Sequence, residues 1–375
     1  MKRYSTDRVT RPPQRLGRRR QILTVTALGA AAVFALAACS SGTATPAASA
    51  TTKSSTASKF YQGKTVTFIV GNAPGSTPAN AMIALKPTLE KELGATLNMS
   101  FSAANPIVPE DQVGTAAPDG LTMGELSLGS ALVGQIAGTG TPQFSLPSAS
   151  FVGATVQQDD LVVACANSPF KTMAQVIAST KPVSVVSQKN TNNGLIASYV
   201  VGAWQIPHTW DYYTASADQL AGCERGDGDI SVGNVSSFTD ASGAAMTAGL
   251  TPLMIISPEP STLSGSFLNS EVPTLAKELK SHAAKGSQGK EAVSLMSVVF
   301  TPTTPSFAIF GPPKVDPAKI AEFTAAMKAA LADPAVEKAF EAQSQPPGFA
   351  DASTVQSFVA TTLKNSSKIK PFLTN

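Results

Sequence analysis

The chain has 375 residues, of which 28 are Lys or Arg and 25 are Asp or Glu, so its formal net charge is +3. Eight of the basic residues and one acidic residue precede residue 39, which leaves 20 basic and 24 acidic residues, or a net charge of about −4, in the remainder. The basic character therefore belongs to the first segment. No basic surface for nucleic acid is indicated beyond it.

The first 38 residues have the pattern of a signal peptide. Arg18, Arg19 and Arg20 precede an uncharged apolar run, Ile22–Ala38, which is short for a helix of roughly 20 residues that spans a bilayer. The run ends in Leu-Ala-Ala followed by Cys39, which resembles a bacterial lipobox. We therefore expect cleavage before Cys39 and a lipid on its thiol, which would anchor the protein at the outer face of the cytoplasmic membrane. Because Arg19 and Arg20 also fit a twin-arginine pattern, both export routes remain open.

Residues 39–59 are expected to form a flexible linker, because Ser, Thr, Ala and Gly dominate them and cannot bury enough apolar surface to offset the entropy of ordering. About 315 residues follow, enough for two lobes with substantial cores.

Short apolar runs alternate with helical stretches through this remainder, an order that predicts an α/β fold. Pro87, inside the first helix, predicts a kink or a helix divided in two. We expect strands at 65–70, 97–101, 121–126, 183–187, 210–213, 229–232, 252–256 and 307–310, and in the apolar stretch 151–163. We expect helices at 80–93, 195–204, 217–223, 316–331 and 336–342, with a helical end to the chain.

Cys165 and Cys223 are the two cysteines that follow Cys39. An extracytoplasmic compartment permits a disulfide between them. Each also ends an apolar or helical pattern, so two small buried thiols fit the sequence equally well.

Catalytic patterns are missing from the chain. Its two histidines, His208 and His282, lie near no Ser, Cys or Glu at a known catalytic spacing, and neither HExxH nor GxSxG occurs. The triplet at 63–65 lacks the earlier glycine of a phosphate-binding loop, and the acidic pair at 227–229 more simply opens a strand than holds a metal. The sequence therefore predicts a protein that is not an enzyme and has neither metal nor cofactor.

Three polar loops follow predicted strands and precede predicted helices, at 72–80, 187–194 and 213–217. Open α/β sheets bind ligands at this place. Backbone amides at a helix start, aided by the helix dipole, can hold a carboxylate without a cation. Ordinary turns and helix caps are the alternative interpretation of each loop.

Several short sequence pieces follow one another in a characteristic order and spacing. They are Thr67–Val70 with Pro74 and Gly75, Ala117–Thr122, Phe170–Ile177, scattered positions from Tyr213 to Asn234, Val272–Glu278 and Ala330–Val336. With these pieces, residues from about 60 to 373 resemble the substrate-binding receptors of tripartite tricarboxylate transporters, the Bug family of extracytoplasmic solute receptors.

The resemblance implies a type II periplasmic-binding-protein fold, with two α/β lobes joined by crossing strands and a ligand cleft between them. Residues 60–160 and 250–375 would form the first lobe, and residues 161–249 the second. The resemblance also implies a small di- or tricarboxylate as ligand and integral-membrane permease subunits as partners. The ligand-binding residues it implies are Gly75, Ser76, Thr77, Ser187, Asn190, Ser216, Ala217 and Asn234, with Ser127 and Ser130 as weaker candidates.

The first loop departs from the family pattern. Where the family usually has several glycines and then Thr-Asp, this chain has Ser76, Thr77, Pro78 and Ala79, so the identity of the ligand is left open. Lys189, in the second loop, either adds a cation to the cleft or is simply solvated. A receptor that has become a sensory or protein-interaction module is the alternative function, and a cell-envelope hydrolase is a more distant one.

Overall fold

A computed structural model describes residues 59–102, 107–139, 143–156, 159–239, 249–257, 271–299, 304–343, 345 and 347–373. The expected signal peptide, Cys39 and the expected linker up to residue 58 lie outside this described part of the chain. Across the described residues, no helix combines the length and the apolar character needed to cross a membrane.

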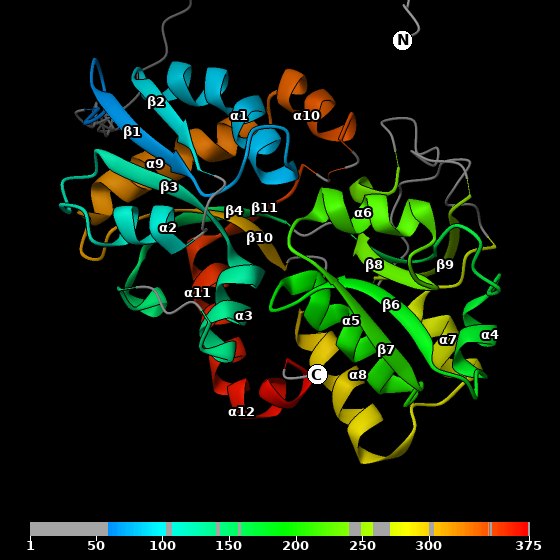
Figure 1. The fold of residues 1–375 in the computed structure, drawn as a ribbon. Helices are drawn as coiled ribbons and strands as arrows, with labels where there is room; N and C mark the ends of the chain where they lie inside the picture. Colours follow the sequence, from blue (N-terminus) through cyan, green and yellow to red (C-terminus); the bar gives the residue numbers. More distant parts are fainter. Residues whose placement is uncertain are drawn as a thin grey trace, which may run out of the picture. The chain divides into compact units, whose positions relative to one another are not determined.

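One sheet has six strands in the order β11-β4-β10-β3-β1-β2 (Figure 1). Its strands are β1 (Thr65–Val70), β2 (Thr96–Phe101), β3 (Thr122–Ser127), β4 (Ser150–Val156), β10 (Pro305–Gly311) and β11 (Phe349–Asp351). The first three are parallel, and the pairs that involve β4, β10 and β11 are antiparallel. The helices around this sheet are α1 (Thr77–Leu93), α2 (Ile107–Gly114), α3 (Leu128–Ala137), α9 (Pro317–Leu331), α10 (Pro334–Glu341) and α11 (Ala352–Lys364).

The other sheet has five strands in the order β7-β6-β8-β5-β9. Its strands are β5 (Asp160–Ala164), β6 (Val183–Gln188), β7 (His208–Tyr213), β8 (Ile230–Asn234) and β9 (Thr251–Ile256). Thus β4 and β5, which are neighbours in sequence, lie in different sheets, and β9 pairs with β5. The helices on this side are α4 (Met173–Ile177), α5 (Asn192–Ala203), α6 (Ser216–Arg225), α7 (Leu275–Ser281) and α8 (Gly286–Val299), and the short α12 (Ser366–Ile369) follows α11.

The α/β class predicted from the alternating pattern is confirmed. Each expected strand and helix occurs, with ends that differ by a few residues. The single apolar stretch 151–163 contains two strands, β4 and β5. Helices α2, α3, α4, α7 and α8 and the short strand β11 were not predicted.

Helix α1 runs unbroken through Pro87, which excludes a divided helix. Proline cannot donate to the carbonyl four residues earlier, and that carbonyl belongs to Ile83, whose side chain is 46% exposed. Pro87 is exposed as well, so water can satisfy the carbonyl that the proline leaves free. The helix ends at Leu93, as predicted, and its C-cap is Gly94, whose φ of 63° is left-handed and suits glycine.

A single cluster of buried apolar side chains extends across both sheets. It includes Leu132 of α3 and Phe310 of β10 on the side of the first sheet, and Tyr199 of α5 and Val232 of β8 on the side of the second. Because burial of apolar surface is the main force in folding, this cluster ties the two sheets to each other where α3 meets α5.

Cys165, which follows β5, and Cys223, in α6, form a disulfide with their Cα atoms 4.6 Å apart. Both residues are buried. The amide of the neighbouring Ala166 donates to the carbonyl of Cys223 at 3.0 Å. The bridge therefore fastens α6 to the start of the segment that leaves β5.

We predict that the double variant Cys165→Ala, Cys223→Ala loses about 3 kcal/mol of unfolding free energy, because the bridge closes a loop with a sequence separation of 58. Guanidinium denaturation of the mature chain measures this loss. Wild type in reductant serves as the control and should match the variant. Equal midpoints for oxidised wild type and the variant would show that the bridge does not stabilise the fold.

Candidate functional site

Four helices begin just after the carboxyl ends of strands. In the first sheet α1 follows β1 and α3 follows β3, and in the second sheet α5 follows β6 and α6 follows β7. The carboxyl ends of parallel strands lie at one edge of a sheet, where helix starts can face a ligand. Eight of the ten sequence-predicted ligand residues lie at these four starts or in the loops that lead to them, and Ser187 lies within β6. Asn234 ends β8, between β6 and β5.

The loop before α1 makes a sharp turn at Gly75, whose φ is 89°. Ser76 is the N-cap residue, but its hydroxyl donates to the carbonyl of Ala73 at 2.7 Å and does not accept from the helix. Pro78 has no amide hydrogen. The amides of Thr77 and Ala79 therefore have no partner within the helix, and of these two residues Ala79 is fully buried whereas Thr77 is partly exposed.

Side-chain capping separates two groups of helices. Helices α4, α5, α7, α9, α10 and α11 each have a Thr or Asp N-cap that accepts a hydrogen bond from a first-turn amide. The N-cap residues of α1, α3 and α6, and that of the four-residue α12, accept no such bond. Because the first amides of a helix have no partner within it, the starts of α1, α3 and α6 keep donors that a ligand can use.

The loop before α5 is held by its own hydrogen bonds. Asn190 has a left-handed φ of 57°, a conformation in which Asn is enriched. The Thr191 hydroxyl accepts from the amide of Gly194 at 3.1 Å and donates to the carbonyl of Gln188 at 3.2 Å. A side chain at Gly194 would collide with that same carbonyl. The Ser216 hydroxyl, at the start of α6, donates to Oε1 of Gln188 at 3.1 Å.

Ser187 is buried, and the side chain of Asn234 is bonded to another residue of the protein. Ser187 is 0% exposed, and its hydroxyl has no hydrogen-bond partner among the described residues. The Asn234 carboxamide donates to Oδ1 of Asp160 at 2.9 Å. Asn234 therefore joins the end of β8 to the start of β5.

A buried carboxylate lies beneath the first loop. Glu125 of β3 is 2% exposed, and it accepts from Nδ2 of Asn72 at 2.9 Å and from the Ser127 hydroxyl at 3.0 Å. Burial raises its pKa from 4.5 to about 7, although these bonds and one from the amide of Gly71 oppose the rise. Burial, and then the charges of Glu125 and Asp111, raise the pKa of Glu110 on α2 to about 8.

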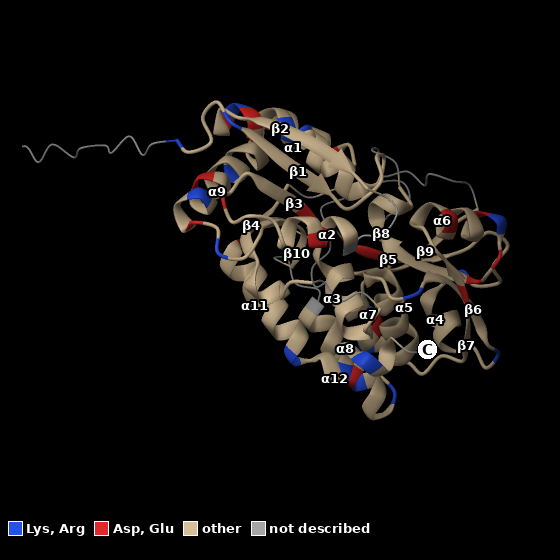
Figure 2. Ribbon diagram, turned by 60° about the vertical axis from the view of Figure 1, so that its left-hand side comes forward, with Lys and Arg blue, Asp and Glu red and all other residues tan. Residues whose placement is uncertain are grey.

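The charges around the site are acidic. Figure 2 shows Asp and Glu (red) on α2, β3 and β5 within the ribbon, whereas most of the blue Lys and Arg segments lie toward its outside. Lys189 has its ammonium group 5.7 Å from the centre of the Tyr212 ring. Across the described residues, His, Cys, Asp and Glu form no group of three or more that could hold a metal.

The predicted ligand residues therefore fall into two groups, those whose side chains bond within the protein and those whose backbone amides stay available. The side-chain donors of Ser76, Ser127, Ser216 and Asn234 are directed to protein acceptors. Backbone amides at Thr77 and Ala217 are donors of the kind that the uncapped helix starts provide. Sequence reasoning missed Glu125 and Glu110, although a lone acid within the apolar stretch 121–126 was a usable signal.

We predict that stability falls as pH rises between about 4.5 and 8, because Glu110 and Glu125 have higher pKa values when folded and the folded chain therefore binds more protons in that interval. Denaturant midpoints at about pH 5.5 and about pH 8.5 test this. Glu110→Gln should flatten the decline. Glu341→Gln, at an exposed carboxylate, is the control and should keep the wild-type slope. Identical slopes for all three proteins would contradict the assignment.

No protein-family model and no curated protein matches the chain in sequence. Solved structures do match it. A TctC solute-binding protein from Polaromonas, without ligand, has a TM-score of 0.60 at 14% identity and covers 84% of this chain and 99% of its own. MatC from Rhodopseudomonas palustris, with bound malate, has a TM-score of 0.59 at 16% identity and covers 83% and 99%. An R. palustris protein with adipate has a TM-score of 0.61 at 14% identity and covers 83% and 97%. The chain therefore has the two-sheet α/β fold of the periplasmic solute-binding proteins.

Proposed function

We propose that the chain is an extracytoplasmic receptor that captures a small carboxylate, of the di- or tricarboxylate type, for a tripartite tricarboxylate transporter. The fold supports this proposal, and so do the malate and adipate held by two of the matched structures. The observation that carries it is the set of uncapped helix starts at α1, α3 and α6.

Backbone amides are well suited to this ligand. A carboxylate that accepts several amide hydrogen bonds at helix starts is stabilised by the bonds and by the helix dipoles together. Because these donors are fixed by the backbone, they need no rearrangement when the ligand arrives. The Thr77 start belongs to the first sheet and the Ala217 start to the second, so a carboxylate ligand with two ends can be held from both sides.

Capture of this kind is reversible. In this proposal residues 60–160 and 250–375 form one lobe and residues 161–249 the other. Within 250–375, however, β9 pairs into the second sheet, and α7 and α8 pack on that side. A ligand that contacts both lobes favours the arrangement in which they are close, by the difference in its affinity for the two arrangements. In the proposed function this closed form docks on the permease subunits, and the lipid on Cys39 keeps the receptor at the membrane.

A second function, a sensory or protein-interaction module, is favoured by one specific observation. The side-chain donors of Ser76, Ser127, Ser216 and Asn234 are already used within the protein. A receptor that has lost its solute would keep such a closed network and bind no small acid. Binding experiments separate the two functions.

We predict that Ala217→Pro weakens carboxylate binding by at least about tenfold, because it removes one first-turn amide donor to a charged ligand, while proline is tolerated in a first helical turn. Isothermal titration with malate, adipate and citrate measures the effect on the mature chain. Ala276→Pro, at the corresponding exposed position of the capped helix α7, is the control and should bind like wild type.

Two results would count against the proposal. If wild type bound none of the three acids while the fold was intact, the module would be favoured over the receptor. If the acids bound and Ala217→Pro had no more effect than Ala276→Pro, capture by the α6 amides would be excluded.

A further inference from the structure

The start of α3 is uncapped because its N-cap side chain is bonded elsewhere. The N-cap residue is Ser127, a residue type that normally accepts a hydrogen bond from a first-turn amide. Here the Ser127 hydroxyl donates to Oε1 of Glu125 at 3.0 Å and accepts from Nδ2 of Asn72 at 3.2 Å. The hydroxyl is therefore held by these two side chains, and the first amides of α3 receive no side-chain cap.

Glu125 connects this helix start with that of α1. Its other oxygen, Oε2, accepts from Nδ2 of Asn72 at 2.9 Å, and the amide of Gly71 bonds to the same carboxyl group. Gly71 and Asn72 belong to the loop between β1 and α1, whereas Ser127 joins β3 to α3. One buried carboxyl group therefore fixes both loops of the first sheet from which we expect ligand contacts.

The neighbouring elements offer Glu125 little compensation for a negative charge. Strands β1 and β10 and helix α3, which contact β3, contain no charged residue within their bounds. From α2, Glu110 faces Glu125, whose charge contributes to the raised pKa of Glu110. The charged residues of α1 begin at Lys86, in its second half, and Lys86 pairs with Glu90. The charge of an ionised Glu125 would therefore oppose an acid that binds nearby.

The protonation state of Glu125 decides where the hydrogen of Ser127 points. An ionised carboxylate can only accept hydrogen bonds, so the Ser127 hydroxyl donates its hydrogen to it. A neutral carboxyl group has an O–H of its own, which can donate to the Ser127 oxygen across the same 3.0 Å contact. The hydrogen of Ser127 is then released, and it can be donated to a ligand oxygen beside the α3 start.

Both states of Glu125 are populated near neutral pH, because burial raises its pKa to about 7. A ligand that prefers the neutral state takes up a proton when it binds, so its affinity falls as pH rises above this value. Glu110 loses a charged neighbour when Glu125 becomes neutral. Its own pKa then falls, which offsets part of the proton uptake.

We propose that Glu125 is a positioning residue of the candidate site, which binds a proton together with the ligand and thereby directs the Ser127 hydroxyl from itself to a ligand carboxylate. This inference rests on the proposed function and deepens it. Capture is then a proton-linked step, and the receptor holds its acid more tightly on the acidic side of neutral pH than on the alkaline side.

Calorimetric titration of the mature chain with malate and adipate, at about pH 6.5 and about pH 8.5, tests this link. Both acids stay fully ionised in this interval, so the ligands add no titration of their own. Wild-type affinity should fall by about tenfold or more. The upper limit is about 25-fold, which is the ratio of the neutral fractions of a group with a pKa of about 7 at these two pH values.

Glu125→Gln imitates the neutral state, because a carboxamide can donate to Ser127 and accept from Asn72. Its affinity should be the same at both pH values, and at the higher pH it should exceed that of wild type. Ser127→Ala should lose about tenfold in affinity at the lower pH and less at the higher pH. Glu341→Gln, at an exposed carboxylate, is the control and should keep the wild-type pH dependence.

A second measurement needs no variant. Titration of wild type at about pH 8, in two buffers of different ionisation enthalpy, should show net proton uptake on binding. No proton uptake, an unchanged wild-type affinity, or a wild-type pH dependence in Glu125→Gln would overturn the inference while carboxylate capture stood. Weaker binding by Glu125→Gln at both pH values would reduce Glu125 to a structural role. If neither acid bound at either pH, the proposed function and this inference would both be wrong.

Discussion

Unsatisfied backbone amides at the starts of α1, α3 and α6 are the constraint on which the account of this site depends. A first-turn amide that is hydrogen-bonded neither within its helix nor by an N-cap side chain must find water or a ligand. The chain supplies Thr or Asp caps to α4, α7, α9, α10 and α11, and also to α5 at the candidate site, so it has the means to satisfy helix starts. The starts of α1, α3 and α6, which lack such caps, therefore leave backbone amide donors at the ends of the strands.

The second feature of the site is that its charged groups are acidic and buried. Glu125 orients Asn72 and Ser127 through hydrogen bonds, and Asp160 does the same for Asn234. A full negative charge at Glu125 would oppose an anionic ligand nearby, but burial raises its pKa to about 7, so part of the population is neutral near neutral pH. Glu125 can therefore hold Asn72 and Ser127 in place while it repels an anionic ligand only moderately.

Much of the fold could be predicted because the local signals are strong. The strand 65–70 is a short β-branched and aromatic run, and α1 has a glycine stop at Gly94. Helix α3 was missed because 128–137 is apolar on nearly all sides and contains two glycines, so it has neither a clear helical period nor a good helix composition. The placement of β9 in the second sheet follows from pairing with β5, about 90 residues away, which no local pattern encodes.

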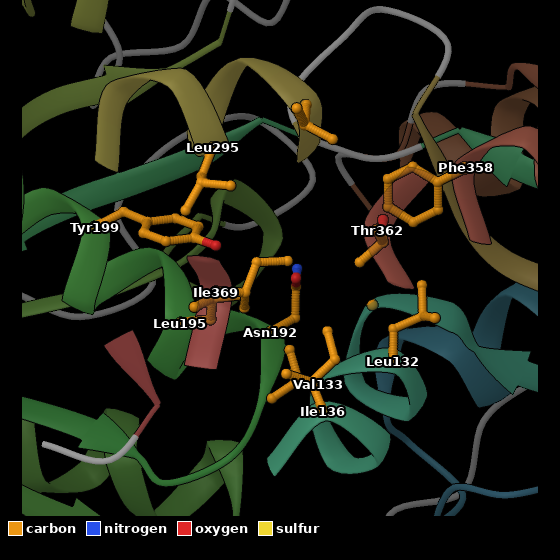
Figure 3. Close-up of a pocket in the computed structure, with 12 residues that line it drawn as sticks. Leu132, Val133, Ile136, Asn192, Leu195, Tyr199, Leu295, Phe358, Thr362 and Ile369 are labelled. Atoms are coloured by element: carbon orange, nitrogen blue, oxygen red, sulfur yellow. The ribbon is translucent and has the colours of Figure 1, made fainter. Parts of the chain in front are cut away.

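The loops that form the candidate site could be predicted from the sequence, but the contacts between their residues could not. Polar loops between strands and helices pointed to Gly75, Asn190 and Ser216, and the structure places all three at such loops or helix starts. The partners could not be foreseen, because the Asn72 to Glu125 bond spans 53 residues and the Ser216 to Gln188 bond spans 28. The small pocket lined by Tyr199 and Thr362 lies between α3, α5, α8 and α11 (Figure 3), and of these helices α3 and α8 were not predicted.

A crystal structure of the mature chain with a bound dicarboxylate would show whether backbone amides at helix starts hold the ligand. We expect carboxylate oxygen atoms about 3 Å from backbone nitrogens in the first turns of α1 and α6, within normal hydrogen-bond geometry. A carboxylate held instead by the Lys189 ammonium group, or bound away from these helix starts, would contradict it.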